Sequence, residues 1–275
     1  MIMRIFIWIV VAVLALLLIL ALTYFIFLVR PRKTKKVKAS LLCEYAHRGL
    51  HGRNVPENSL LAFELACRAG YGIELDIQLS KDGQVMVFHD FTLVRMTGHS
   101  GRVNELDCWE LVKLKLAGTE ETIPTFSQVL DLVNGRVPLL VELKGETFDT
   151  ALCKKAAQLL ASYQGEYCIE SFNPLLLRDM GKYLPTSMRG ILYTNVCKEK
   201  RKYDVIHICL TLMAFNFLAK PAFVAFDKKY RRSLPVKITT GLYKAPKFVW
   251  TIKTDGELAE ARGYAEKSIF EKEDK

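Results

Sequence analysis

Hydrophobic residues divide the chain into two parts with different patterns. An almost unbroken apolar run covers Ile5–Leu28, and only Thr23 and Tyr24 interrupt it. A helix rises about 1.5 Å per residue, so this run is long enough to cross a hydrocarbon core about 30 Å thick. The run is longer than the apolar stretch of a secretory signal peptide, and large residues fill its end. We therefore predict an uncleaved transmembrane anchor over residues 1–29.

Beyond residue 40 the pattern changes to short apolar runs that alternate with helical stretches. This alternation predicts β–α units around a parallel sheet, and eight such runs fit one (β/α)8 TIM barrel. The expected strands are Leu41–Ala46, Gly72–Leu79, Pro138–Leu143, Tyr167–Ser171, Met188–Tyr193, Phe223–Phe226, Phe248–Ile252 and Lys267–Phe270. We therefore expect an α/β fold, with a linker at residues 30–40 and one barrel domain over residues 41–275.

Polar residues mark the starts of the helices between these strands. Asn58 or Ser59 is expected to cap a helix over Leu60–Ala69, and Gly70 is expected to end it. Two pairs have the spacing of capping boxes at the starts of further helices, Thr125 with Gln128 and Thr254 with Glu257.

Three segments depart from a plain barrel. Residues 91–123 are more than a β–α loop requires, so we expect a small insertion packed beside the barrel. Val205–Leu218 is apolar but is interrupted by His207 and Asn216, and we interpret it as core rather than as a second span. Few residues follow Phe270, so we expect the last loop and helix to be short or replaced by the N-terminal region.

The positive charge of the chain is concentrated next to the apolar run. Residues 1–43 contain seven basic side chains and no acidic one, whereas the remainder carries 32 basic and 29 acidic residues. The net charge of +10 is therefore mostly a feature of the anchor. It is not the basic patch on a folded domain that binding to nucleic acid requires, so we expect no nucleic-acid partner.

The distribution of these bases also predicts a topology. Six bases follow the apolar run, and Arg4 alone precedes it. The positive-inside rule then predicts a single-pass protein of the cell membrane, with the folded domain in the cytoplasm. The six bases also suit the anionic headgroups of a lipid bilayer, and they are Arg30, Arg32, Lys33, Lys35, Lys36 and Lys38.

The seven cysteines agree with a cytoplasmic domain. They are scattered, odd in number and without a CxxC pair. This pattern is typical of reduced, mostly buried thiols, and it favours neither a disulfide framework nor a zinc site.

Carboxylates in two of the predicted strands are the first candidates for a catalytic or metal-binding site. Side chains alternate along a strand, so Glu74 and Asp76 point to one face of the second strand, into the barrel. Glu142 and Lys144 share the inward face of the third strand in the same way. Barrel active sites lie at the carboxyl ends of the strands. Three inward carboxylates make a hard oxygen site that suits Mg²⁺ or Ca²⁺, although pairing with nearby bases is an alternative.

Two histidines follow strand-like segments close to these carboxylates. His47 ends the first strand, and His89 ends the run Val85–His89. Cleavage of a phosphodiester needs one group that removes a proton and another that protonates the leaving alkoxide. Histidines titrate near neutrality and can do both.

The stretch from Ala46 to Asp90 resembles the signature of the glycerophosphodiester phosphodiesterase family, and the resemblance extends over nearly all of residues 41–271. The parts within this stretch are AHRG (Ala46–Gly49), PENSLLAF (Pro56–Phe63), ELDIQLSKDG (Glu74–Gly83) and VFHD (Val87–Asp90). Farther along the chain, and in the family's order, are IPTFSQVL (Ile123–Leu130), VELK (Val141–Lys144), SFN (Ser171–Asn173) and VWT (Val249–Thr251). The chain is similar to a membrane-anchored member of the bacterial type. The resemblance implies a TIM barrel that hydrolyses glycerophosphodiesters to glycerol 3-phosphate and an alcohol in lipid metabolism.

The resemblance also implies roles for particular residues. Glu74, Asp76 and Glu142 would bind the divalent metal, and His47 and His89 would be the acid and base in either order. Arg48 and Lys144 would contact the phosphate, Glu57 would support the site, and Trp250 would form an apolar wall or ordinary core.

Three alternative functions stay open at this point. A barrel tethered to a bilayer could act on membrane lysophospholipids as a lysophospholipase D. A phosphoinositide phospholipase would use a related barrel and release a cyclic product. A scaffold without chemistry would have lost its polar site residues, yet all of them are present.

Overall fold

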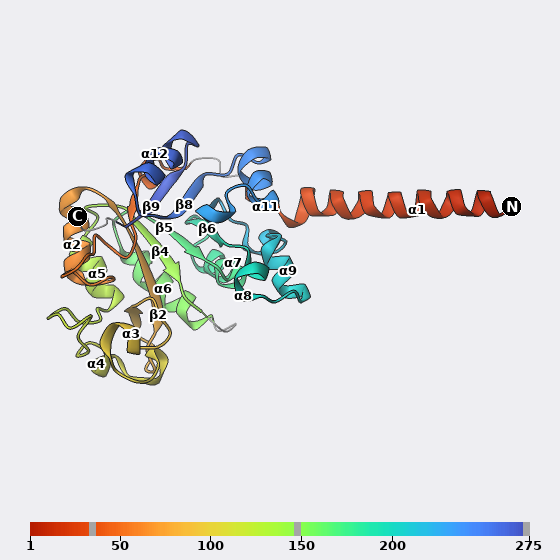
Figure 1. Ribbon diagram of the computed structural model, residues 1–275. Coiled ribbons are helices and arrows are strands. Elements are labelled where there is room, and N and C mark those ends of the chain that lie inside the picture. Colours follow the sequence, from red (N-terminus) through yellow and green to blue (C-terminus); the bar gives the residue numbers. More distant parts are fainter. Residues whose placement is uncertain (33–36, 146–149, 272–275) are drawn as a thin grey trace.

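The computed structural model describes residues 1–32, 37–145 and 150–271, and it shows a long N-terminal helix that leads into a barrel (Figure 1). Helix α1 (Ile2–Thr23) continues through a π-helical turn, η1 (Tyr24–Leu28), and projects away from the barrel. Among the described residues, Ile2–Leu28 is the one helix that is long and apolar enough to cross a membrane. The predicted basic residues Lys33, Lys35 and Lys36 and the tail 272–275 lie outside the described residues.

Eight parallel strands close the barrel, which confirms the predicted fold. They are β1 (Tyr45–Ala46), β2 (Gly72–Leu79), β4 (Leu139–Leu143), β5 (Tyr167–Ser171), β6 (Met188–Tyr193), β7 (Phe223–Asp227), β8 (Lys247–Ile252) and β9 (Lys267–Phe270). β1 pairs with both β2 and β9, so the sheet closes on itself. The short β3 (Val85–Val87) runs antiparallel to β2.

The first strand is shorter than its sequence pattern predicts. Of the expected Leu41–Ala46, only Tyr45 and Ala46 pair with neighbouring strands, and Ala39–Leu41 forms a 3-10 turn, η2. Leu41 is nevertheless buried among side chains inside the barrel, and its carbonyl accepts a hydrogen bond from Tyr45 Oη at 3.0 Å. The apolar character of this segment therefore reflects burial at the amino-terminal end of the barrel.

Helices cover the outside of the barrel. The longest are α2 (Leu60–Ala69), α5 (Phe126–Val133), α6 (Ala151–Ser162), α7 (Pro174–Tyr183) and α12 (Asp255–Gly263). Ser59 caps α2, and Gly70 ends it in the left-handed conformation. Thr125 and Gln128 form the predicted capping box, and Thr254 caps α12. Each cap satisfies backbone N–H groups that lack a partner in the first turn of a helix.

Residues 91–123 form an excursion beside the barrel mouth with a small core of their own. The excursion contains α3 (Val94–Thr97), the 3-10 turn η3 (Val103–Glu105) and α4 (Cys108–Leu111). Its core includes Leu93, Val103, Leu111 and Ile123. The excursion lies on the side of the barrel away from α1 (Figure 1).

The prediction that Val205–Leu218 belongs to the core is wrong for its first half. The connection from β6 to β7 is broken into α8 (Val196–Lys200), α9 (Val205–Thr211) and α10 (Asn216–Ala219). No residue of α9 is buried, whereas Met213 and Asn216 are. The connection from β7 to β8 is equally irregular, with η4 (Lys228–Tyr230), α11 (Leu234–Val236) and the π-helical η5 (Lys237–Leu242).

The seven cysteines are free thiols, but fewer of them are buried than the sequence suggests. Cys153, Cys168 and Cys197 are buried, and the other four are half-buried.

Aromatic rings fill the inside of the barrel because one interior position is a glycine. The rings of Phe223 and Phe248 lie 4.9 Å apart between their centroids. Gly190, on the neighbouring strand β6, leaves room for them, since a Cβ added there would lie 2.0 Å from the Phe223 ring. The interior layer therefore depends on the absence of a side chain at residue 190.

We predict that Gly190→Ala destabilises the barrel by about 1–3 kcal/mol, because the added methyl group overpacks its interior. Thermal unfolding of the detergent-solubilised protein would show a midpoint several degrees below that of the unmodified chain. Gly263→Ala is the matched control, because nothing lies within 4 Å of the added Cβ. An unchanged midpoint for Gly190→Ala would contradict this description of the core.

Candidate active site

Three carboxylates meet inside the mouth of the barrel. Glu74 and Asp76 point inward from β2, and Glu142 points inward from β4, where it pairs in register with Asp76. All three side chains are buried, and one carboxylate oxygen from each lies within 4.8 Å of the others. The structure therefore brings together the three residues that the sequence predicts as metal ligands.

A fourth buried carboxylate, Glu170, was not recognised from the sequence. It lies on β5 directly beside Glu142, and its buried Oε2 atom has no hydrogen-bond partner among the residues that the structure describes. Burial, and then the charges of Glu74 and Glu142, raise the pKa of Glu170 well above its ordinary value. The inward and outward alternation that identifies Glu74 also applies to Glu170, so the signal was present in the strand Tyr167–Ser171.

Lys144 provides part of the compensating charge. It follows β4, and its Nζ atom lies 2.9 Å from Asp76 Oδ1 and 2.8 Å from Glu142 Oε1. Burial would lower the pKa of Lys144, but the two carboxylates outweigh it and raise that pKa. Burial would likewise raise the pKa of Asp76, but Lys144, His89 and Arg48 lower it below its ordinary value.

The cluster still contains more negative charge than its bases compensate. Burial, followed by the charges of Asp76 and Glu142, raises the pKa of Glu74 well above its ordinary value. Burial also raises the pKa of Glu142 to about 7, even though Lys144 opposes the shift. A divalent cation would remove this excess, and a donor set made only of carboxylate oxygens fits a hard cation. The three predicted residues therefore fit a divalent metal.

The backbone of the AHRG turn positions His47 and Arg48. Arg48 has a φ of 54° and Gly49 a φ of 83°, both in the left-handed region. A Cβ at Gly49 would lie 2.8 Å from the Ala62 side chain, so the turn can pack on α2 only with glycine there. The Arg48 N–H donates a hydrogen bond to Glu74 Oε2 at 2.9 Å, which fixes the turn to the carboxylate cluster.

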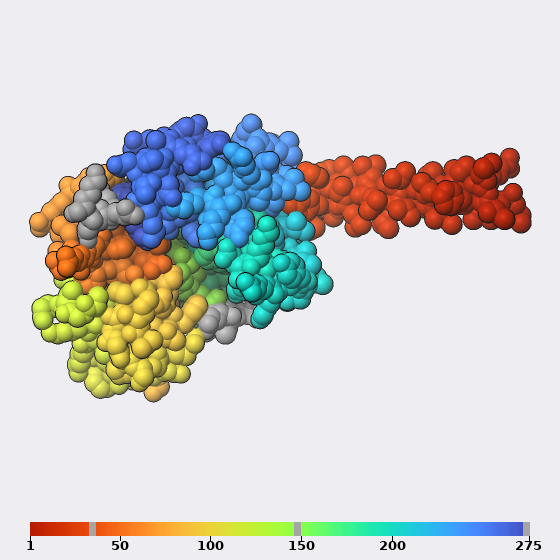
Figure 2. Space-filling view, in the orientation of Figure 1, coloured from red at the N-terminus to blue at the C-terminus, as the bar shows by residue number. Residues whose placement is uncertain are grey.

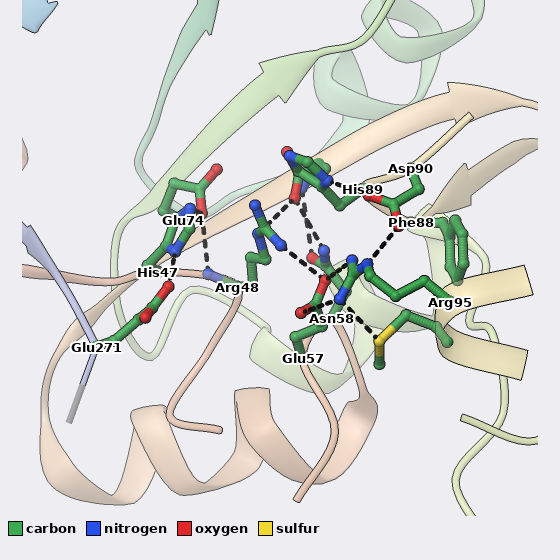
Figure 3. A network of polar contacts seen from close by, with 12 residues as sticks. His47, Arg48, Glu57, Asn58, Glu74, Phe88, His89, Asp90, Arg95 and Glu271 are labelled. Carbon is green, nitrogen blue, oxygen red and sulfur yellow. Dashed lines mark hydrogen bonds and ion pairs between the residues drawn. The ribbon is translucent and has the colours of Figure 1, made fainter. Parts of the chain in front are cut away.

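Each histidine is held by a carboxylate on its Nδ1 atom (Figure 3). His47 Nδ1 lies 2.7 Å from Glu271 Oε1, and His89 Nδ1 lies 2.6 Å from Asp90 Oδ1. This leaves both Nε2 atoms for the site, and that of His47 lies 3.9 Å from Glu74 Oε2. Burial lowers the pKa of both histidines, while the hydrogen bonds of the two carboxylates oppose the shift. With Nδ1 bonded to a carboxylate, Nε2 accepts a proton when the imidazole is neutral and donates one when the imidazole is protonated.

A ladder of charged side chains holds Arg48 against the cluster (Figure 3). The Arg48 guanidinium lies 2.7 Å from Glu57 Oε1 and 3.5 Å from Asp76 Oδ2. Arg95, from the excursion, donates to Glu57 and also pairs with Asp90, so it ties the two histidine-bearing segments together. Glu57 thus supports Arg48 and is not part of the carboxylate cluster.

Asn58 also belongs to this site, and Ser59 is the helix cap of the two predicted candidates. Ser59 performs the capping, and Asn58 is buried. Asn58 Nδ2 donates a hydrogen bond to Asp76 Oδ2 at 2.9 Å. The sequence alone did not distinguish the two adjacent polar residues.

These groups surround a small cavity of about 110 Å³. Its walls include His47, Arg48, Glu74, His89, Glu142, Lys144, Glu170 and Trp250. Trp250 packs edge-on against Phe172, with ring centroids 5.7 Å apart. The cavity therefore gathers both predicted histidines, both predicted phosphate contacts and two of the three predicted ligands around a volume that admits a small polar group.

A larger groove of about 920 Å³ adjoins this cavity. It shares Glu142, Lys144 and Phe172 with the cavity and continues between apolar residues towards α9, where Ile206 and Leu210 line it. Figure 2 shows the surface hollowed between the yellow excursion and the cyan residues near 200.

A parallel barrel with buried carboxylates and two histidines at its mouth is the arrangement of a metal-dependent phosphodiesterase. Residues 47–266 match the glycerophosphoryl diester phosphodiesterase family, and the chain belongs to that family. It is therefore a phosphoric diester hydrolase, as the motifs predict.

Individual relatives agree with this assignment. The chain is 38% identical over 197 residues to the glycerophosphodiester phosphodiesterase of Caldanaerobacter subterraneus subsp. tengcongensis, which covers 67% of this chain and 80% of that protein. It is 32% identical over 146 residues to lysophospholipase D GDPD1 of Rattus norvegicus, covering 48% of this chain and 45% of that protein. A phosphodiesterase from Oleispira antarctica, solved with the product sn-glycerol-3-phosphate, has the same fold, with a TM-score of 0.71, 22% identity and coverage of 85% and 94%.

We predict that a divalent cation stabilises the protein more at about pH 8 than at about pH 6, because the cation must displace a proton from Glu142. Without a cation, the pKa of Glu142 is raised from 4.5 to about 7. Between these values the folded chain holds a proton that the unfolded chain has lost, so the contribution of Glu142 to stability falls as pH rises through this window. Thermal unfolding with and without Mg²⁺ or Ca²⁺ measures the effect.

Glu142→Gln supplies the control for this measurement, because glutamine is isosteric but carries no negative charge. The variant should lose most of the cation-dependent shift, because one of the three ligands is gone. Equal stabilisation at both pH values, or a full shift in Glu142→Gln, would contradict the role of Glu142 as a ligand.

Proposed function

We propose that this protein hydrolyses glycerophosphodiesters to glycerol 3-phosphate and an alcohol, with Mg²⁺ or Ca²⁺ bound by Glu74, Asp76 and Glu142. The observation that carries the proposal is the convergence of this carboxylate cluster with the two histidines on one cavity. The bound cation would polarise a phosphoryl oxygen and hold the substrate in place.

The residues around the cavity supply the remaining chemistry. Arg48 and Lys144 lie where they can donate hydrogen bonds to phosphate oxygens, and both carry full positive charge. Such charges stabilise the transition state in a site that excludes water. One of His47 and His89 removes a proton from the attacking oxygen, and the other protonates the leaving alkoxide. Glu271 and Asp90 orient the two imidazoles so that Nε2 performs the transfer in each case.

The groove favours a second candidate substrate, a membrane lysophospholipid, which would make the protein a lysophospholipase D. A head group bound at Lys144 could extend an acyl chain from Leu192, which lines both the cavity and the groove, to Leu210, which lines the groove alone. A water-soluble glycerophosphodiester has no group that uses this apolar surface. The rat relative described above is named a lysophospholipase D.

We also propose the arrangement of the chain in the cell. Residues 1–29 would form a single-pass anchor of the cell membrane, and residues 30–40 a basic linker at the headgroups. Residues 41–275 would form the catalytic domain, with residues 91–123 as a small insertion. The excess of basic residues after α1 supports a cytoplasmic location for this domain.

The direct test measures product release by metal-stripped, full-length protein in detergent. The substrates are glycerophosphoethanolamine, glycerophosphocholine and lysophosphatidylcholine, each with Mg²⁺ or Ca²⁺. Cation-dependent glycerol 3-phosphate is the expected product of the first two. Lysophosphatidate from the third would establish the second candidate, and no turnover with any pair would refute both.

We predict that Asp76→Asn abolishes this turnover while the protein stays folded, because the amide removes a ligand and a partner of Lys144. Asp179→Asn is the matched control, since Asp179 is a buried carboxylate that pairs only with bases on the outer helix α7 in the described part of the chain. The two variants are compared by turnover and by thermal unfolding. Full activity of Asp76→Asn would remove Asp76 from the site.

We predict that Glu271→Gln shifts one limb of the pH–rate profile to lower pH and reduces kcat. The hydrogen bond from Glu271 opposes the burial that lowers the pKa of His47, so its loss lowers that pKa further. The loss of kcat should be smaller than the ~10²–10⁴-fold loss typical when a general acid or base is removed, as in His47→Ala. Profiles of kcat/KM for the three proteins test this, and an unshifted profile would show that Glu271 has no such effect.

A further inference from the structure

Helix α9 exposes neighbouring apolar side chains on the surface of the barrel domain. The side chains of Val205, Ile206 and Ile208 are 76%, 62% and 41% exposed, and no residue of α9 is buried. Tyr203, just before the helix, is 69% exposed. Side chains of this kind normally face a core or a partner, so their exposure on neighbouring positions indicates a binding surface.

This surface lies next to the end of the apolar helix that joins the barrel, as contacts between distant parts of the chain show. Tyr24 Oη donates a hydrogen bond to the Leu212 carbonyl at 2.9 Å, and Asn216 Nδ2 donates to the Val29 carbonyl at 2.8 Å. The rings of Phe27 and Phe217 stack with centroids 5.1 Å apart. The segment that carries α9 is thus fixed against the last turns of the apolar helix, at the edge of the barrel from which α1 projects (Figure 1).

A second group of exposed apolar residues lies on the other side of the end of α1 that joins the barrel. Leu234 of α11 and Leu242 of η5 are 56% and 62% exposed. Tyr243, next to Leu242, donates a hydrogen bond from its hydroxyl to the Phe25 carbonyl, so this edge is also attached to η1. Both apolar edges therefore border α1.

The charge around α9 fits an anionic headgroup layer. The seven residues before the helix include four exposed basic residues, Lys198, Lys200, Arg201 and Lys202, against two exposed acidic residues, Glu199 and Asp204. Amphipathic segments that lie in a membrane interface combine basic residues with aliphatic and aromatic side chains in this way. Tyrosine, as at residue 203, is enriched at the level of the headgroups.

We propose that residues 198–212 form a bilayer-docking surface, which inserts the apolar face of α9 into the headgroup region beside α1. The proposal rests on α1 crossing the membrane, because α1 then places any group bonded to Tyr24 at the bilayer surface. A lipid surface matches this position better than a protein partner does, since the bilayer surrounds α1 on every side. Docking of both apolar edges, on either side of α1, holds the barrel in a fixed orientation on the membrane.

This orientation has a consequence for the groove. Ile206 and Leu210 belong both to α9 and to the groove wall, whose other end reaches Glu142 and Lys144. With α9 in the headgroup region, the outer end of the groove opens against lipid.

Photocrosslinking to lipid tests the proposal in full-length protein reconstituted into phosphatidylglycerol–phosphatidylcholine vesicles. p-Benzoylphenylalanine replaces Val205 in one protein and Val94 in a matched control. Val94 is also the first residue of a short helix and is 58% exposed, but it lies in the excursion, far from α1 (Figure 1). A third protein carries the crosslinker at Leu14, in the middle of α1. Mass spectrometry after illumination detects lipid adducts, and catalytic activity is not required.

The expected result is lipid adducts at residues 205 and 14 and none at residue 94. Adducts at residue 14 alone would overturn the docking proposal and leave the anchor in place. Adducts at neither 205 nor 14 would overturn the docking proposal and the anchor together. Equal adducts at 205 and 94 would also overturn it, because contact with lipid would then not be specific to α9.

Discussion

The burial of several carboxylates in one barrel mouth is the constraint on which the site depends. Glu74, Asp76, Glu142 and Glu170 come from three adjacent strands and face the same interior. Lys144 and Arg48 compensate part of their charge, and burial together with the remaining negative charge raises the pKa values of Glu74 and Glu142. Burying several carboxylates of like charge costs free energy, and a single divalent cation bound between them compensates that charge.

The rest of the site follows from the need to hold this cluster in place. The left-handed turn at Arg48 brings a backbone N–H to Glu74, and Asn58 donates to Asp76. The ladder from Arg48 through Glu57 to Arg95 extends this support to the excursion. Each imidazole is oriented by a carboxylate that lies outside the cluster, which separates proton transfer from cation binding.

Local sequence patterns predicted the elements and the inward residues, because alternation along a strand is a local property. Seven of the eight strands agree with prediction to within one residue at either end, and the inward carboxylates of β2 and β4 do meet. Contacts between residues far apart in the sequence have no comparable local pattern. Glu271 is 224 residues from His47, and the location of α9 depends on where α1 leaves the barrel. Apolar residues in α9 therefore looked like core.

Anomalous diffraction from crystals soaked in Mn²⁺ reports the position of a bound divalent cation without any activity assay, so it tests directly whether the carboxylate cluster binds one. We predict an anomalous peak within coordination distance of Glu74, Asp76 and Glu142, with Lys144 Nζ moved away from at least one of these carboxylates. His47, His51 and Glu271 form another cluster of potential ligands. A peak at that cluster alone, or no peak among Glu74, Asp76 and Glu142, would contradict the assignment of the three carboxylates as metal ligands.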